Sequence, residues 1–310
     1  MIPATLIAAI LALAVFGTLL ARVSPPHERT LLILCVIATC PMCWVMFHWV
    51  RLPLDQWLQP MLGSGRVLPW IRSAYAPFTE EPAKLWPLAL PFVRRAVDRG
   101  SFGRFAFALG LGFGLGEIFT VAGLLSARRP EISGLPWYLL TGFIYERFMV
   151  CAIHPAMTAV ALAGWRRGGS MALGLSLAML AHWLTNFPIT MAQRGWLGPN
   201  AAISQAIVSL WVFACFAAAV GFMASLLFPQ VRLRRKLLGE AICPGCGQRY
   251  ERGVFTGLNA GGNRRYERCP FCRHWHWTQR AKPTKPGEGA RTNESETPPP
   301  LSRKQAPNDP

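Results

Sequence analysis

Acidic and imidazole side chains stand inside stretches of this chain that are otherwise apolar. They belong to Glu80, Glu81, Glu117, Glu146, His154 and His182. A charge at bilayer depth costs at least about 2.5 kcal/mol, and charged residues kept there usually mark functional sites. Carboxylates can act as general bases toward water, and together with imidazoles they can ligate a metal ion. This polar set is therefore the first candidate for a functional site.

The spacing within the set suits acid–base chemistry. Lys84 follows Glu81 by three residues and Glu80 by four, so on a helix the lysine can neutralise part of a carboxylate pair that would otherwise repel itself. Adjacent carboxylates in a low dielectric do not ionise equally, which leaves one of them as a base. His182 and Asn186 lie four residues apart on one helix face, as two donors aimed at one oxygen would need to be.

Each feature also has a purely structural explanation. Glu80 and Glu81 could begin a helix at the membrane interface, where the helix dipole favours acids. Glu117 could bond a neighbouring helix, and a single histidine in a membrane helix is often structural. The pair Glu146-Arg147 is expected to be a buried or snorkelling ion pair. Only the combination, in order and at compatible depth, favours a common site.

The composition indicates a membrane protein. Hydrophobic residues make up 52% of the 310 residues, charged residues only 15%, and the mean hydropathy is +0.28, which excludes an ordinary soluble domain. About 20 apolar residues are needed to cross the hydrocarbon core. Seven spans are predicted, at 3–21, 29–50, 79–97, 103–125, 135–165, 168–190 and 201–228. The third is the weakest because prolines interrupt it, and the first is expected to be an anchor rather than a signal peptide.

The positive charge predicts an orientation. The net charge is +17, and from Val231 onward 16 basic residues face 7 acidic ones. The basic segment 232–236 directly follows the last span and should stay in the cytoplasm, which with seven crossings puts the N-terminus outside. In this topology Glu117, His154 and His182 reach similar depths in a bacterial cytoplasmic membrane, and the site opens toward its outer half.

Two further motifs inside the predicted spans favour packing over chemistry. Four glycines at alternate positions, from Gly110 to Gly116, do not have dinucleotide-binding spacing and follow no strand. They predict close helix packing that brings another helix near Glu117. Cys40 and Cys43 have the spacing of a redox pair but lie within a span, so we expect them to be apolar filling.

The tail carries two CxxC motifs, Cys243–Cys246 and Cys269–Cys272, with 22 residues between them. This spacing is typical of a tetrahedral site of four thiolates, so a zinc ribbon with a structural zinc is predicted over 241–280, and a disulfide pair is the alternative. The domains are then a transmembrane unit at 1–230, a basic linker at 231–240, the ribbon, and a disordered tail at 281–310 rich in Pro, Lys, Glu and Ser.

Arginines and the run His274-Trp-His-Trp277 give the ribbon a basic, aromatic character. Such a surface can contact nucleic acid or anionic headgroups. Because the ribbon is tethered to a membrane domain, an anionic lipid or a partner protein is the expected contact, and nucleic acid is not.

The membrane residues resemble those of the PrsW-type intramembrane proteases, within the superfamily that includes the CAAX prenyl endopeptidases. The resemblance covers about 79–187. It rests on Glu80-Glu81-Pro-Ala-Lys84, on Phe113-Gly-Leu-Gly-Glu117, on His154 and on His182-x-x-x-Asn186. It implies that Glu80 and Glu81 activate the attacking water, that His154 positions water or a metal, and that His182 and Asn186 stabilise the oxyanion. Glu117 would be a further polar member of the site, while Glu146-Arg147 resembles a related branch of the superfamily.

The resulting prediction is an all-α polytopic membrane protein with a small β zinc ribbon, acting as an intramembrane endopeptidase on membrane-anchored protein substrates within the lipid bilayer. A catalytic zinc at the membrane site and a metal-free glutamate mechanism both fit the residues. The alternative is a non-catalytic membrane scaffold or immunity-type protein that uses the same helices. A transporter would predict paired repeats in the two halves, which the sequence does not contain.

Overall fold

The computed structural model describes residues 1–63, 67–99, 102–166, 170–198, 200–228, 239–252, 257–259 and 264–281. The chain divides into a helical unit within its first 237 residues and a small β unit that begins at Leu238. Residues 231–238 of the predicted linker and the predicted disordered tail beyond Ala281 lie outside the described residues.

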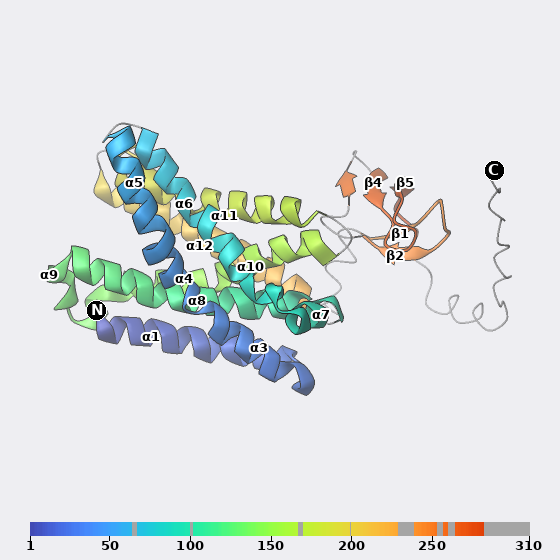
Figure 1. The fold of residues 1–310 in the computed structure, drawn as a ribbon, viewed down its shortest axis with the longest axis horizontal. Coiled ribbons are helices and arrows are strands. Elements are labelled where there is room, and N and C mark those ends of the chain that lie inside the picture. Colours follow the sequence, from blue (N-terminus) through green and yellow to red (C-terminus); the bar gives the residue numbers. More distant parts are fainter. Residues whose placement is uncertain are drawn as a thin grey trace, which may run out of the picture. The chain divides into compact units, whose positions relative to one another are not determined.

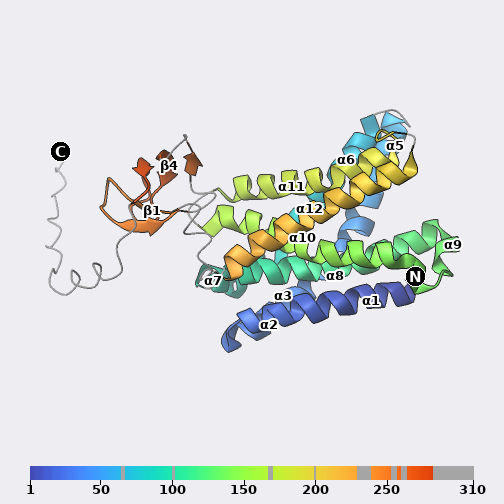
Figure 2. The same cartoon turned by 180° about the vertical axis from the view of Figure 1, so that it is seen from behind.

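The helical unit is a bundle of long apolar helices with several breaks (Figures 1 and 2). Its N-terminal elements are α1 (Ile2–Ala12), η1 (Leu13–Gly17), α2 (Thr18–Val23), α3 (Pro26–Thr39), α4 (Met42–Val45), η2 (Met46–Arg51) and α5 (Leu52–Leu62). The elements that follow are α6 (Val67–Lys84), η3 (Trp86–Ala89), α7 (Pro91–Arg99), α8 (Phe102–Arg128), α9 (Pro130–Ser133), η4 (Trp137–Leu140), α10 (Thr141–Arg166), α11 (Met171–Gln193) and α12 (Ala201–Leu227).

Six helical segments of the described chain are long and apolar enough to cross a membrane. They are Ile2–Val23, Pro26–Leu62, Phe102–Arg128, Trp137–Gly164, Met171–Gln193 and Ala201–Leu227. Each of them contains most of one predicted span. The second is much longer than predicted, because helical structure resumes after the turn at Pro41 and continues to Leu62.

The predicted third span, 79–97, is wrong as a single helix. Helix α6 begins at Val67 and ends at Lys84, and a 3-10 turn with Pro87 at its start separates it from α7, which begins at Pro91. Proline lacks the N–H that a helix interior requires but suits a first turn, so these two prolines start new elements. In both views the broken segment from α6 to α7 leads from the α5 end of the bundle to the opposite end (Figures 1 and 2).

Helix α8 is the centre of the bundle and the most buried of the six apolar segments. It packs against α10 on one side and α3 on another. A Cβ added to Gly110 would lie 2.6 Å from the carbonyl carbon of His154 in α10, and one added to Gly112 would lie 2.8 Å from the Cα of Val36 in α3. The prediction that the glycine run allows close helix packing is therefore confirmed.

The β unit holds two small antiparallel sheets. Strands β1 (Glu240–Ile242) and β2 (Arg249–Glu251) form one sheet, and β3 (Gly257–Asn259), β4 (Arg264–Arg268) and β5 (Trp275–Gln279) form the other in that order. In the larger sheet Tyr266 pairs with Leu258 on one side and Trp277 on the other. The short strands agree with the small β ribbon predicted from the sequence.

Candidate functional site

Helices α6 and α11 contribute the first half of the polar cluster. Glu81 is fully buried on α6, where the Lys84 ammonium donates to its Oε1 at 2.5 Å. The same oxygen accepts a hydrogen bond from Nδ1 of His182 on α11, at 2.6 Å. A carboxylate can only accept, so Nδ1 carries the proton and Nε2 of this imidazole points away from Glu81. Glu81 thus fixes both the orientation and the tautomer of His182.

Helices α8 and α10 contribute the second half. Both oxygens of Glu117 are engaged, since Oε1 accepts from Arg147 at 2.8 Å and Oε2 accepts from Nε2 of His154 at 2.5 Å. The second guanidinium nitrogen of Arg147 donates to Glu146 at 2.6 Å. The Glu146-Arg147 ion pair expected from the sequence is present, and Arg147 also orients Glu117.

A cation that was not predicted from the sequence completes the cluster. Arg51, the residue after the predicted second span, lies in the π-helical segment η2 and forms an ion pair with Glu80, while its Nε donates to Thr79 at 3.0 Å. π-helical turns inside helices are common at functional positions because they redirect side chains. The signal available in the sequence was electrostatic: Lys84 can neutralise only one of two adjacent buried carboxylates.

The two halves meet. The His154 and His182 rings have centroids 5.6 Å apart, and Nε2 of His182 is 3.7 Å from Oε2 of Glu80. Ligating atoms of Glu80, Glu117 and His154 all lie within 4.8 Å of one another. The structure therefore gathers five of the six predicted catalytic side chains, from four helices, into one connected cluster.

A cavity of about 40 Å³ adjoins this cluster. Its polar lining comes from Glu117, Glu146, Arg147, His154, His182, Thr185 and Asn186, and its apolar lining from Val150, Ile153, Met157, Ile189 and Val212. A cavity of this size with several polar groups can hold water. Asn186, the sixth predicted side chain, lines the cavity beside His182 as the four-residue spacing predicted.

The charges of the cluster leave a small negative balance. The carboxylates are those of Glu80, Glu81, Glu117 and Glu146, and the fixed cations are Arg51, Lys84 and Arg147. Four negative charges against three positive charges leave one negative charge, which a protonated histidine or a bound cation would neutralise. Oε2 of Glu80 and of Glu81 and Nδ1 of His154 are buried without a hydrogen-bond partner among the described residues.

Lys84 is positioned by packing as well as by charge. Its side chain is fully buried, and its ammonium lies 5.1 Å from the ring centroid of Phe113. The same ring meets His154 edge to face at 5.2 Å. The sequence allowed Lys84 to pair with either glutamate, and in the structure its ion pair is with Glu81.

The four tail cysteines form a second, separate cluster that could hold a metal ion. All four are free thiols, with Sγ atoms 3.6 Å apart between Cys243 and Cys272 and between Cys246 and Cys269. Four thiolates around one zinc at 2.3 Å would be separated by about 3.8 Å. The geometry thus fits the predicted four-thiolate ligand set, and these cysteines form no disulfide.

Both cysteine knuckles have the same backbone geometry. Gly247 and Arg273, which follow the second cysteine of each motif, have φ values of 70° and 62° and donate to the carbonyls of Cys243 and Cys269 at 2.8 and 3.0 Å. Burial raises the pKa of the Cys243 thiol, but hydrogen bonds from the backbone of Cys246 and Gly245 outweigh it and lower that pKa to about 7. This knuckle is prepared to present a thiolate near neutral pH.

Comparisons with protein-family models, with curated proteins and with solved structures found no match to this chain. The resemblance to PrsW-type proteases therefore stays a prediction, and the functional argument depends on the geometry of the cluster.

Proposed function

We propose that the helical unit is an intramembrane endopeptidase that hydrolyses membrane-anchored proteins. The observation that carries this proposal is the convergence of glutamates and imidazoles from α6, α8, α10 and α11 into one cluster, in which Glu117, His154 and His182 line a cavity large enough for water. Buried ionisable groups are costly in a membrane bundle, and their gathering beside a polar cavity is more typical of a reaction site than of packing.

Glu80 is the proposed general base. Arg51 holds one of its oxygens, while Oε2 is buried without a partner among the described residues and lies 3.7 Å from His182. This oxygen would take a proton from water as the hydroxide attacks the peptide carbonyl carbon. The same carboxyl would then return the proton to the leaving amine, which completes hydrolysis with no other reactant.

His182 and Asn186 are the proposed stabilisers of the oxyanion. Because Nδ1 of His182 already donates to Glu81, the imidazole can donate toward substrate through Nε2 only when it is doubly protonated. Glu81 and Lys84 are then positioning residues, and Glu117 with Arg147 positions His154.

A zinc-dependent variant of the same reaction is supported by the donor set. Glu80, Glu117 and His154 provide two carboxylates and an imidazole within 4.8 Å, the number of protein ligands that catalytic zinc sites use. Bound zinc would supply Lewis acidity toward the substrate carbonyl. Both oxygens of Glu117 are engaged by neighbouring cations and imidazole, so binding would require the Glu117–His154 contact to rearrange.

The test is to map new protein N-termini in cells that express the wild type, Glu80→Gln or Glu131→Gln. Glu131 is an exposed glutamate on α9, outside the cluster, and serves as a matched control. Cleavage products present with the wild type and the control but lost with Glu80→Gln, at equal amounts of folded protein, support the hydrolase. Products that persist at full yield with Glu80→Gln would rule out the proposed base.

A non-catalytic scaffold is the second candidate, and one observation favours it. Every carboxylate of the cluster already has a cationic partner, as expected for a polar network whose only role is to hold helices together. In that case the biological phenotype survives Glu80→Gln and no cleavage product depends on the protein.

For the β unit we propose a structural zinc held by the four tail cysteines, in a tail on the cytoplasmic side of a bacterial cytoplasmic membrane. The separation of the sulfur atoms supports this metal. A reducing compartment would keep the thiols available to it, which agrees with the orientation predicted from the basic linker.

A further inference from the structure

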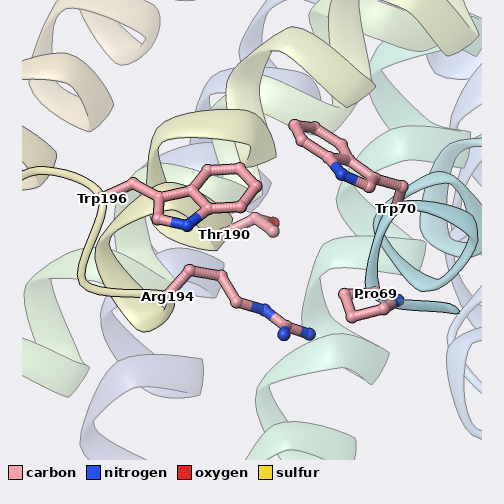
Figure 3. Close-up of a pocket in the computed structure, with 5 residues that line it drawn as sticks. All are labelled: Pro69, Trp70, Thr190, Arg194 and Trp196. Carbon is pink, nitrogen blue, oxygen red and sulfur yellow. The ribbon is translucent and has the colours of Figure 1, made fainter. Parts of the chain in front are cut away.

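A second and larger pocket lies between α6 and the turn that follows α11 (Figure 3). It has a volume of about 460 Å³ and is lined by Pro69, Trp70, Thr190, Arg194 and Trp196. It shares no lining residue with the cavity beside the glutamate–histidine cluster. Volumes of this size are typical of sites for small ligands.

The local backbone positions the pocket's aromatic wall. Helix α11 ends in a Schellman turn, in which Trp196 N donates to Met191 O at 3.0 Å and Gly195 takes a φ of 71°. This turn brings Trp196 to within 5.0 Å of Trp70 between ring centroids, and Trp70 also stacks on Phe187 at 5.8 Å. The pocket therefore has a built indole wall contributed by two separate elements.

Arg194 supplies the charge. Its side chain extends from the turn toward Pro69, beneath the two indoles (Figure 3). The guanidinium is not needed to cap α11, because backbone N–H groups of Arg194, Gly195 and Trp196 already satisfy the last carbonyls. Among the described residues no carboxylate forms an ion pair with Arg194, whereas Arg72, farther along α6, is paired with Asp55.

A guanidinium with no ion-pair partner in the described part of the chain, between exposed indoles at the end of an apolar helix, matches the chemistry of a membrane interface. Trp rings settle at headgroup depth, and the planar fork of Arg binds phosphate oxygens in pairs. An aliphatic or neutral polar ligand would leave the charge unused. A ligand with a phosphate ester and an apolar body uses both the charge and the rings.

We propose that this pocket binds the phosphate-bearing headgroup of a membrane lipid. Arg194 holds the phosphate, and Trp70 and Trp196 flank the glycerol and the first acyl carbons. The bound lipid bridges α6 and α11, the helices that carry Glu81 and His182. Trp70 precedes Glu80 by ten residues, or about 15 Å along a helix. The site therefore clamps these two helices within reach of the polar cluster, although binding itself does not depend on the proposed hydrolysis.

The experiment is a binding titration of the purified full-length protein in neutral detergent, followed by native mass spectrometry. The probes are phosphatidylglycerol, diacylglycerol with the same acyl chains, and inorganic phosphate. Wild type, Arg194→Gln and Trp196→Ala are compared with Arg128→Gln, which removes an exposed arginine at the end of α8 outside the pocket.

Phosphatidylglycerol should bind to the wild type and to Arg128→Gln at least about tenfold more tightly than it binds to Arg194→Gln, which is the loss expected for one charge-assisted phosphate contact. It should also bind to the wild type and to Arg128→Gln at least about tenfold more tightly than diacylglycerol does. Competition by millimolar inorganic phosphate would identify phosphate alone as sufficient and would overturn the lipid assignment. Equal binding by Arg194→Gln and Arg128→Gln would overturn the site. If Arg194→Gln does not fold, Arg194→Met, which also removes the charge, gives the same comparison.

Discussion

The buried ion pair between Lys84 and Glu81 makes the sharpest stability prediction. Both side chains are fully buried, and their nitrogen and oxygen atoms are 2.5 Å apart. The perturbation is a double-mutant cycle of Lys84→Met, Glu81→Gln and the two together. Gln is chosen at position 81 because its carbonyl oxygen can still accept the hydrogen bond that His182 donates.

The expected magnitude follows from the burial. Removing one partner leaves the other charge in the bundle interior without compensation, which costs about 3–5 kcal/mol. At about 1.4 kcal/mol for each factor of ten, that is a loss of roughly 150-fold to several thousandfold in the folding equilibrium constant. Replacing both partners removes both charges, so the double variant should lie within about 1 kcal/mol of the wild type.

Reversible unfolding of the purified protein in mixed detergent micelles, followed by circular dichroism, measures these differences. The exposed pair of Arg72 and Asp55 is a matched control because Arg72 also lies on α6 and its side chain is 41% exposed. Arg72→Met, Asp55→Asn and their combination should each change stability by less than about 1 kcal/mol.

Two results would refute this reasoning. If Lys84→Met costs no more than Arg72→Met, the ammonium is not a buried charge that needs a partner. If the double variant loses as much as the two single variants together, the two groups are not coupled, and Lys84 would be held by Phe113 and helix packing instead.

Three further predictions concern the glycine contacts of α8, the ion pair of Arg51 and the tail cysteines. Gly116→Ala should prevent folding, because its Cβ would lie 2.8 Å from the carbonyl carbon of Cys40. Gly123→Ala should be tolerated, because no neighbouring atom lies within 4 Å of its added Cβ. The yield of folded protein in size-exclusion chromatography distinguishes the two variants. Arg51→Met should destabilise the protein by about 3–5 kcal/mol, because its ion pair with Glu80 is nearly buried. Adding Glu80→Gln to this variant should restore most of the lost stability, and unfolding in mixed micelles measures both changes. The full-length protein should lose one zinc per chain in Cys243→Ser relative to the wild type, but not in His276→Ala or in Cys215→Ser. Metal analysis after dialysis would contradict the four-thiolate site if Cys243→Ser and the wild type held equal amounts of zinc.

The parts of the fold that depend on local pattern were predictable. Six of the seven spans predicted from long apolar runs correspond to membrane-length segments, and alternate glycines predicted close packing around α8. The two CxxC motifs predicted the cysteine cluster, because a knuckle brings its two sulfurs together within four residues. In each case neighbours in the sequence determine the result.

What depends on pairing between distant segments was not predictable. Lys84 had two glutamates within reach on its own helix. Its pairing with Glu81 accompanies two contacts with other helices, of the Lys84 ammonium with Phe113 and of Glu81 with His182. Arg51 reaches Glu80 across 29 positions from a π-helical turn that no periodicity signals. The end of α6 was predictable only in part, since Pro77 and Pro82 are accommodated within the helix whereas Pro87 begins a new turn.

The alternate glycines of α8 also lock that helix in register. Gly110 and Gly114 meet α10, while Gly112 and Gly116 meet the chain around Val36 and Cys40. One inserted or deleted residue would turn everything beyond it by about 100° and shift it by 1.5 Å. Glu117 would then turn away from α10, and the close contacts of α8 with its neighbours would be lost. Natural variants of α8 should therefore show substitutions but no single-residue length changes between the first glycine and the carboxylate.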